Sequence, residues 1–119
     1  MSHEKQITAE MRECIQNCTE CHKICMEMVV HCLGLGGKHA SQEHIRLLLD
    51  CAQICQTSAD YMLRGSPLHT RTCGICAEVC QMCAEDCERM AGSDRTMRDC
   101  VEKCRRCADS CMKMSGAAV

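Results

Sequence analysis

The chain has 119 residues and a formal net charge of −2. It therefore lacks the basic surface that nucleic-acid-binding domains use to neutralise phosphates. Its one aromatic residue, Tyr61, cannot provide the stacking platforms that hold unpaired bases. No stretch is apolar for long enough to span a membrane. We expect a single domain over residues 1–119, and we note that 16 of these residues are cysteine.

Breaks in the sequence predict four helices. A cluster of glycines ending at Gly37 closes the first apolar pattern, and Ser41 is suited to cap the next helix. Ser66 and Pro67 are typical of the start of a third helix, and Gly92 ends it. The predicted helices cover residues 4–33, 42–64, 67–91 and 94–115.

The cysteines recur every three or four residues within these helices. They are Cys14, Cys18, Cys21, Cys25 and Cys32, then Cys51 and Cys55, then Cys73, Cys76, Cys80, Cys83 and Cys87, then Cys100, Cys104, Cys107 and Cys111. This spacing places the sulfurs of each helix on one stripe. Because short connections make successive helices antiparallel, the predicted fold is all-α, an antiparallel up-down-up-down four-helix bundle with a Cys-lined core.

The second helix is the exception to this pattern. It keeps Cys51 and Cys55, but Ser58 and Met62 occupy the positions where the stripe would continue. The sequence therefore predicts a core with three thiol-rich walls and one wall that is only partly lined with sulfur.

Thiolates three or four residues apart lie on adjacent helical turns and can clamp one ion. Such soft ligands select Cu(I), Zn(II) or iron–sulfur clusters. Structural zinc sites use four ligands in a closed tetrahedron, and iron–sulfur clusters are bound by loop motifs, so neither suits a continuous ladder on straight helices. Cu(I) accepts two or three thiolates, and one sulfur can bridge two ions. A tube of thiols would then hold multiple Cu(I) ions per chain, which indicates storage or buffering and not an enzyme.

Three other interpretations of the cysteines stay open beside copper. One is a zinc or iron–sulfur protein, and another is a thiol redox protein that uses Cys73 with Cys76 or Cys80 with Cys83. The redox motif lacks the βαβ context in which it normally works. The third is a disulfide scaffold, but residues 1–6 are polar and contain no apolar signal region, which favours a cytoplasmic location and reduced thiols.

The Cys ladders of the first, third and fourth helices resemble those of the Cys-rich four-helix-bundle copper storage proteins of bacteria, specifically their cytosolic branch. The resemblance covers the whole chain. It implies that all 16 cysteines are copper ligands, that the protein is a homotetramer, and that Cu(I) enters at one end of the bundle where Met or His residues lie. A copper chaperone or a thiol donor would deliver the ions.

Methionine and histidine gather at the two ends of the predicted bundle. One end has Met11, Met62, His69 and Met114, and the other has Met28, His31, His44, Met90 and Met97. These residues either fill irregular core space or form a weakly binding vestibule that passes Cu(I) to the thiolates. We take His44, His69, Met62 and Met114 as candidate ligands. The charged residues, including Asp86, Glu88 and Arg105, fall mainly off the Cys stripes and predict a solvated face.

Overall fold

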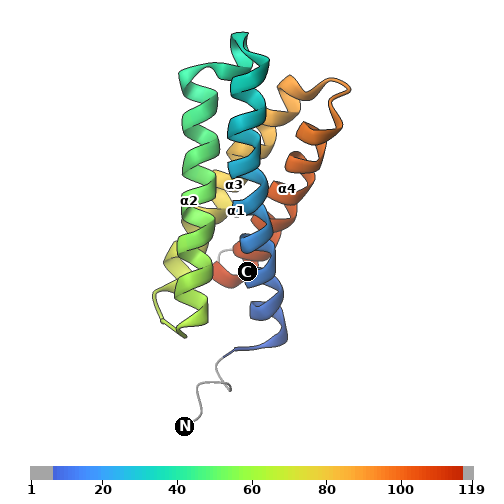
Figure 1. Ribbon diagram of the computed structural model, residues 1–119. Helices are drawn as coiled ribbons and strands as arrows, with labels where there is room; N and C mark the ends of the chain where they lie inside the picture. Colours follow the sequence, from blue (N-terminus) through green and yellow to red (C-terminus); the bar gives the residue numbers. More distant parts are fainter. Residues whose placement is uncertain (1–6, 117–119) are drawn as a thin grey trace.

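The computed structural model describes residues 7–116, and these residues form four long α-helices (Figure 1). The helices are α1 (Ala9–Leu35), α2 (Gln42–Leu63), α3 (His69–Ala91) and α4 (Arg95–Ser115), with a short 3-10 helix, η2 (Gly37–Ala40), between α1 and α2. Each helix packs against its neighbours in the chain, and α1 closes the bundle against α4. The all-α up-down-up-down bundle predicted from the sequence is confirmed.

Two helix starts differ from the prediction because local hydrogen bonds set them later. The Oγ1 of Thr8 accepts a hydrogen bond from the Met11 N–H at 3.1 Å, so α1 begins at Ala9. The predicted residues 4–6 lie outside the described residues. Before α3, the Oγ of Ser66 accepts a hydrogen bond from the Leu68 N–H at 3.2 Å, which holds Pro67 in a turn and delays the helix to His69.

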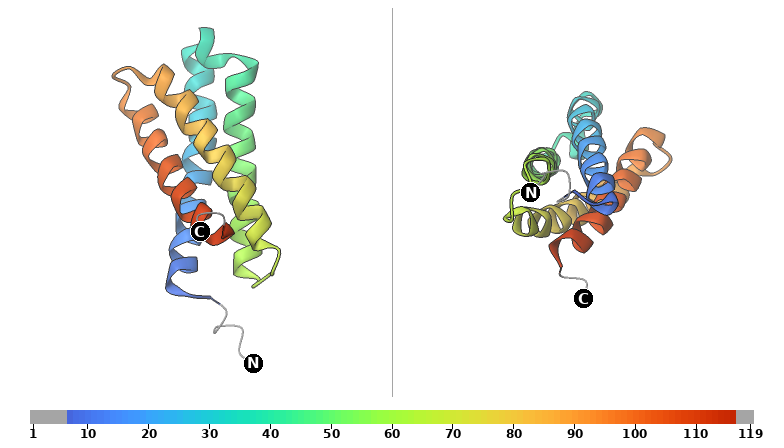
Figure 2. Two further views of the ribbon diagram at one scale, coloured as in Figure 1. Left: turned by 180° about the vertical axis from the view of Figure 1, so that it is seen from behind. Right: turned by 90° about the horizontal axis from the view of Figure 1, so that it is seen from below.

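The bundle consists of two helical hairpins that cross at an angle. Figure 2 shows that the α3–α4 hairpin is inclined to the α1–α2 hairpin and that its loop leans outward. The η2 segment and the α3–α4 turn lie at one end, which we call the η2 end. The α2–α3 turn and the start of α1 lie at the other, which we call the α2–α3 end. Any ion inside the bundle would therefore lie between two hairpins.

Small side chains allow the four helices to approach one another. Besides cysteine, the buried positions include several alanines, such as Ala52, Ala77, Ala84 and Ala108. The larger buried side chains lie toward the ends and include Met28, Leu48, Met62 and Met97. Because sulfur and methyl groups replace the usual Leu and Phe, the middle of the core is a narrow sulfur-lined column and not a conventional apolar core.

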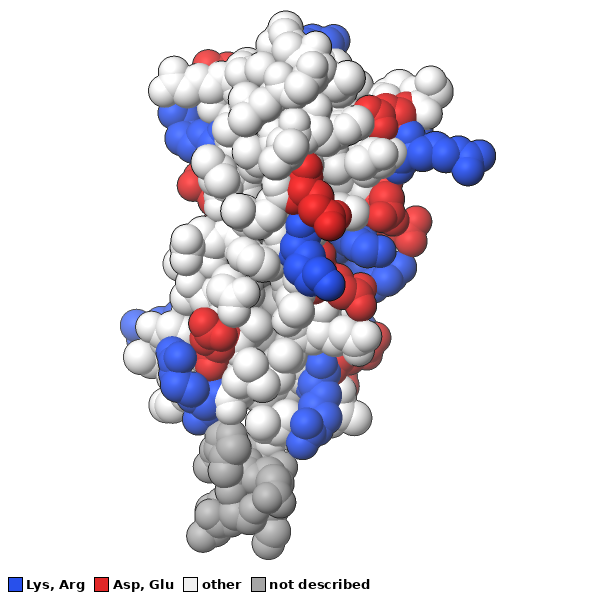
Figure 3. Space-filling view, viewed as in Figure 1, with Lys and Arg blue, Asp and Glu red and all other residues white. Residues whose placement is uncertain are grey.

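Charged side chains cover the outside of the bundle and pair with one another. Lys103 pairs with Asp99 one turn away at 3.5 Å, and the Glu88 carboxylate on α3 binds Arg105 on α4. In Figure 3, charged side chains form a band on the side of α1 that faces α4 and gather along the edges of the bundle, whereas an uncharged area lies between α1 and α2. Within residues 7–116, no helix is both long and apolar enough to cross a membrane.

Candidate metal centre

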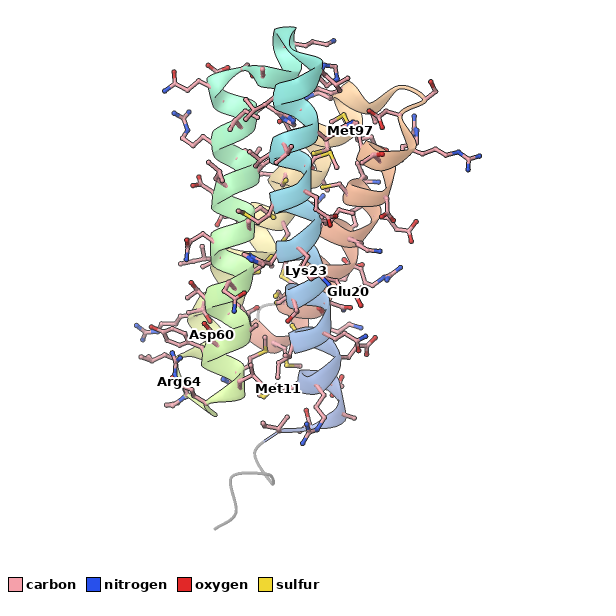
Figure 4. The ribbon with its side chains drawn as sticks, viewed as in Figure 1. Met11, Glu20, Lys23, Asp60, Arg64 and Met97 are labelled. Atoms are coloured by element: carbon pink, nitrogen blue, oxygen red, sulfur yellow. The ribbon has the colours of Figure 1, made fainter. Side chains whose placement is uncertain are left out.

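All 16 cysteines are free thiols with at most 1% of their surface exposed, and they form one column inside the bundle (Figure 4). Most of their shortest contacts join different helices. Examples are the Sγ–Sγ distances of 3.5 Å for Cys18–Cys111, 3.6 Å for Cys21–Cys104 and 3.5 Å for Cys55–Cys80. Within a helix, sulfur contacts of this kind join Cys76 to Cys80 at 3.8 Å and Cys100 to Cys104 at 3.9 Å. The stripes therefore meet across the bundle axis as well as along each helix.

Twelve of the 16 thiols fall into five groups, and within each group the sulfur atoms lie within 4.8 Å of one another. The groups are Cys14, Cys73 and Cys111; Cys18, Cys76, Cys107 and Cys111; Cys55, Cys76, Cys80 and Cys107; Cys21, Cys51, Cys55 and Cys80; and Cys21, Cys25, Cys51 and Cys104. Each successive group shares one or two sulfurs with the one before it. The five groups thus form a chain of linked sites along the bundle.

This sharing decides which metal chemistry fits the column. Among the four groups of four, at most two can be chosen without a shared sulfur. Four-coordinate Zn(II) ions with their own ligands could therefore occupy only two of these groups at once. An ion that accepts bridging thiolates can use every group, which is the behaviour expected of Cu(I).

Hydrogen bonding makes the buried thiols unequal as acids. Hydrogen bonds from Cys104 and Cys25 lower the pKa of Cys100 to about 5, and Cys104, which donates to its neighbour, has a pKa raised well above 9.0. Burial, together with the negative charges of Cys100 and Asp94, raises the pKa of Cys32 to about 11. Because metal binding requires thiolates, a thiol with a lowered pKa such as Cys100 supplies a ligand more readily than Cys32 does.

A second type of site lies at the η2 end. The Nε2 of His44 is 3.2 Å from the Sγ of Cys32, and its Nδ1 is 2.6 Å from the Oδ2 of Asp86. His44 is only 1% exposed, and Asp86 also pairs with Arg89 at 3.1 Å. The carboxylate accepts the Nδ1–H, which fixes the tautomer in which Nε2 carries the lone pair. A carboxylate that orients a histidine in this way is a common support of metal-binding imidazoles.

The family model for the copper storage proteins matches residues 7–116. The chain belongs to the copper storage protein family. This match covers all of the described residues, including every cysteine. The resemblance seen in the Cys ladders is therefore confirmed at the level of the family.

Several solved structures, two of them of copper storage proteins, are similar to this chain in sequence and fold. The protein Nmul_A1745 of Nitrosospira multiformis is 44% identical, with a TM-score of 0.85 over 91% of this chain and 96% of that chain. The Cu(I)-bound copper storage protein BsCsp3 of Bacillus subtilis is 29% identical, with a TM-score of 0.81 over 89% and 98% of the two chains. A cytosolic copper storage protein of Streptomyces lividans, solved with five coppers, is 28% identical, with a TM-score of 0.80 over 90% and 92%.

The methionine and histidine candidates have different surroundings in this copper storage protein. Met62 is fully buried, and its Sδ lies 3.8 Å from the Sγ of Cys73. Met114 is partly buried against the core. His69 is partly buried, and its Nδ1–H donates to the Ser66 carbonyl at 2.8 Å. Of the four candidates, Met62 and His44 thus have a direct contact with a cysteine sulfur.

Two polar features were missed by reasoning from the sequence. Asp86 was predicted to lie on a solvated face, but this was wrong, because its carboxylate turns inward to bind His44. Its position next to Cys87, at the edge of the α3 stripe, was the available signal. The second feature is a bridge between α1 and α4, where the Asn17 side-chain amide donates to the Ser110 Oγ at 3.2 Å. Neither residue of that bridge had a distinguishing sequence pattern.

Proposed function

We propose that this protein stores or buffers Cu(I) in the cytoplasm and holds many ions per chain in its sulfur column. The observation that carries the proposal is the chain of five thiol groups with shared members. Shared sulfurs are what bridging Cu(I)–thiolate chemistry needs. They do not suit catalysis at one defined centre, because an ion in any one group alters the ligands of the next.

The sulfur spacing supports the same conclusion. Neighbouring sulfurs such as Cys55 and Cys76, or Cys21 and Cys51, are 3.7 and 3.8 Å apart. A metal–thiolate bond is about 2.3 Å long, which places sulfurs about 4.0 Å apart around a trigonal ion and about 4.6 Å apart around a linear one. The thiols therefore need only small movements to enclose a trigonal ion, and the helices can stay in place.

We further propose that all 16 cysteines are ligands and that the four candidates at the ends supplement them. His44 would bind through Nε2 together with Cys32, since Asp86 holds the opposite nitrogen. Met62 would bind beside Cys73, at the α2–α3 end. His69 and Met114 would form the outer part of that end. Thioethers carry no proton that must leave, so they can pass Cu(I) onward at low cost.

The cytoplasmic location is supported by the Streptomyces lividans relative, which is described as cytosolic. Free thiols are also the state that a reducing compartment maintains. A copper chaperone or a small thiol would supply Cu(I) in such a compartment. Because one sulfur column joins all four helices, we propose that residues 1–119 act as one domain.

We propose that the protein is a homo-oligomer, with a tetramer as the expected form. Exposed apolar side chains on α1 support this, because Met26, Val30 and Leu33 recur at helical spacing and are 45%, 73% and 54% exposed. All three lie on α1. Light scattering of the reduced protein would measure the mass, and a strictly monomeric protein would reject the oligomer.

Anaerobic titration of the reduced protein with Cu(I), in the presence of a chromophoric chelator, tests the storage function. We expect the chain to withdraw Cu(I) from the chelator until on the order of one ion is bound per cysteine. A parallel titration with Zn(II) distinguishes the alternative. Tighter binding of about two Zn(II) ions, with little Cu(I) uptake, would favour a zinc protein instead.

A further inference from the structure

Ser58 is a fully buried residue whose hydroxyl has no partner. Its exposed fraction is 0%, and among residues 7–116 its Oγ has no hydrogen-bond partner. A buried hydroxyl that gives up its hydrogen bonds to water without replacement destabilises the fold. Serines inside helices commonly avoid this penalty by bonding to a backbone carbonyl in their own helix, as the partly buried Ser110 does to Cys107 at 3.2 Å. An exception of this kind requires an explanation.

The position of Ser58 indicates what its hydroxyl faces. It follows Cys55 by three residues and precedes Met62 by four, so it lies on the core stripe of α2 between them. The Sγ of Cys55 contacts that of Cys76 at 3.7 Å, and Met62 contacts Cys73 at 3.8 Å. Because α2 and α3 run antiparallel, Ser58 lies at the level between Cys73 and Cys76. This is where the three-thiol group joins the rest of the column.

The three-thiol group differs from the others in the number of its ligands. It consists of Cys14, Cys73 and Cys111, whereas each of the other groups has four thiols. In the α2 wall beside it, serine stands where a fourth helix could have supplied a sulfur. A serine oxygen is a hard ligand that Cu(I) does not favour, so Ser58 is not expected to bind the ion itself. Its hydroxyl hydrogen can instead interact with sulfur.

We propose that Ser58 is a hydrogen-bond donor to a thiolate of the copper-loaded column, at the level of the three-thiol group. This inference rests on the proposed function of Cu(I) storage. Neighbouring sulfurs that are neutral thiols in the reduced apo protein are weak acceptors. Loading converts them to thiolates, which accept stronger hydrogen bonds, and coordination reorients the cysteine side chains. The hydroxyl thereby acquires in the loaded state the partner that it lacks in the apo state.

This role predicts effects of opposite sign in the two states. Replacing Ser58 with alanine removes an unsatisfied polar group from the apo protein and also improves helix propensity, so the apo protein becomes more stable. The same change removes a hydrogen bond from the loaded protein, so copper bound near the three-thiol group is held less tightly. If Ser58 had a purely structural role, its replacement with alanine would instead lower the stability of the apo protein.

The experiment compares wild type, S58A and S58T, each as the full chain under anaerobic, reducing conditions. The first measurement is the thermal midpoint of the apo protein. The second is the release of bound Cu(I) to increasing concentrations of a chromophoric chelator. We expect S58A to have a higher apo midpoint and to lose part of its copper at roughly ten-fold lower chelator concentration. S58T retains the hydroxyl and should release copper as the wild type does. S110A, which removes a hydroxyl that already has partners, should lower the apo midpoint.

The outcomes separate this inference from the proposed function. Copper release from S58A that matches wild type, or a lower apo midpoint for S58A, would overturn the role of Ser58 while leaving storage intact. Loss of retention in S58T equal to that in S58A would also overturn it, because the donor is present there. A wild-type protein that withdraws little Cu(I) from the chelator would overturn both the storage function and the role of Ser58.

Discussion

Replacement of Asp86 with alanine tests whether the buried carboxylate–histidine–thiol array supports the η2 end of the core. The substitution removes the acceptor for the Nδ1–H of His44, which lies 2.6 Å from the carboxylate oxygen. His44 is 1% exposed, so water cannot readily replace the lost acceptor. The substitution also ends the pairing of Asp86 with Arg89.

The expected loss follows from the burial of the two partners. Leaving a buried donor unsatisfied costs about 1–3 kcal/mol, and a hydrogen bond to a charged group contributes about 1.5–3 kcal/mol. The Arg89 side chain is 68% exposed, so its ion pair adds less than about 1 kcal/mol. Alanine recovers roughly half a kcal/mol through its higher helix propensity. We therefore expect D86A to lower the free energy of unfolding of the reduced apo protein by about 2 kcal/mol.

Equilibrium unfolding in urea, followed by far-ultraviolet circular dichroism, measures this change. E85A is the matched control, because Glu85 is the adjacent carboxylate on α3 but is exposed, and its hydrogen bond is to Gln81 on the same helix. We expect E85A to stay within about 0.5 kcal/mol of wild type. A double-mutant cycle with H44A should give a coupling of at least about 1 kcal/mol between residues 44 and 86. Equal stabilities for D86A and E85A would refute the buried array.

Three further predictions concern other parts of the molecule. The pKa of Cys32 is raised from 9.0 to about 11, so its contribution to apo stability is complete below pH 9 and is lost as the pH rises from 9 toward 11. Urea unfolding of C32S should therefore show a weaker decline in the free energy of unfolding over this interval than wild type does. A decline equal to that of wild type would contradict the shift. Asp94 accepts hydrogen bonds from the N–H groups of Thr96 and Met97, so D94A should lower apo stability by about 1 kcal/mol at neutral pH, as measured by thermal unfolding. The hydrogen bond to His31 lowers the pKa of Asp94, so the contribution of Asp94 to stability is present above pH 3.8 and disappears as the pH falls through the lowered pKa. If D94A stayed less stable than wild type in acid below that pKa, this pH dependence would be wrong. Finally, S58C adds a thiol to α2, the helix with the fewest cysteines, and native mass spectrometry should find about one more Cu(I) per chain than in wild type. A copper count equal to that of wild type would show that this position does not face the sulfur column.

The cysteine stripes could be predicted because helical periodicity is a local property. Gaps of three and four residues fix the direction of Cys14, Cys18 and Cys21 from one helix regardless of its neighbours. Glycine positions likewise marked the helix ends, since Gly36 and Gly92 have positive φ values of 74° and 52° at the ends of α1 and α3. The buried environment of every cysteine follows from these two patterns.

The contacts between stripes could not be predicted, because they depend on the axial offset and rotation of one helix against another. The sequence suggested pairs within a helix, whereas the shortest sulfur contact of Cys18 is with Cys111 on another helix at 3.5 Å. The inward turn of Asp86 was missed for the same reason, since its partner His44 lies 42 positions away in the chain. Cys32 appeared equivalent to its neighbours in the stripe, yet its short contact is with the imidazole of His44.

The position of copper along the bundle tests the central claim most directly. Crystals of the fully loaded protein, grown anaerobically, would be measured with X-rays at the copper absorption edge, where bound copper gives an anomalous signal. We predict a row of copper peaks inside the bundle that follows the linked thiol groups from Cys14, Cys73 and Cys111 to Cys21, Cys25, Cys51 and Cys104. Adjacent peaks should share cysteine ligands. Copper confined to one or two isolated sites, or bound only on the outer surface, would contradict the account.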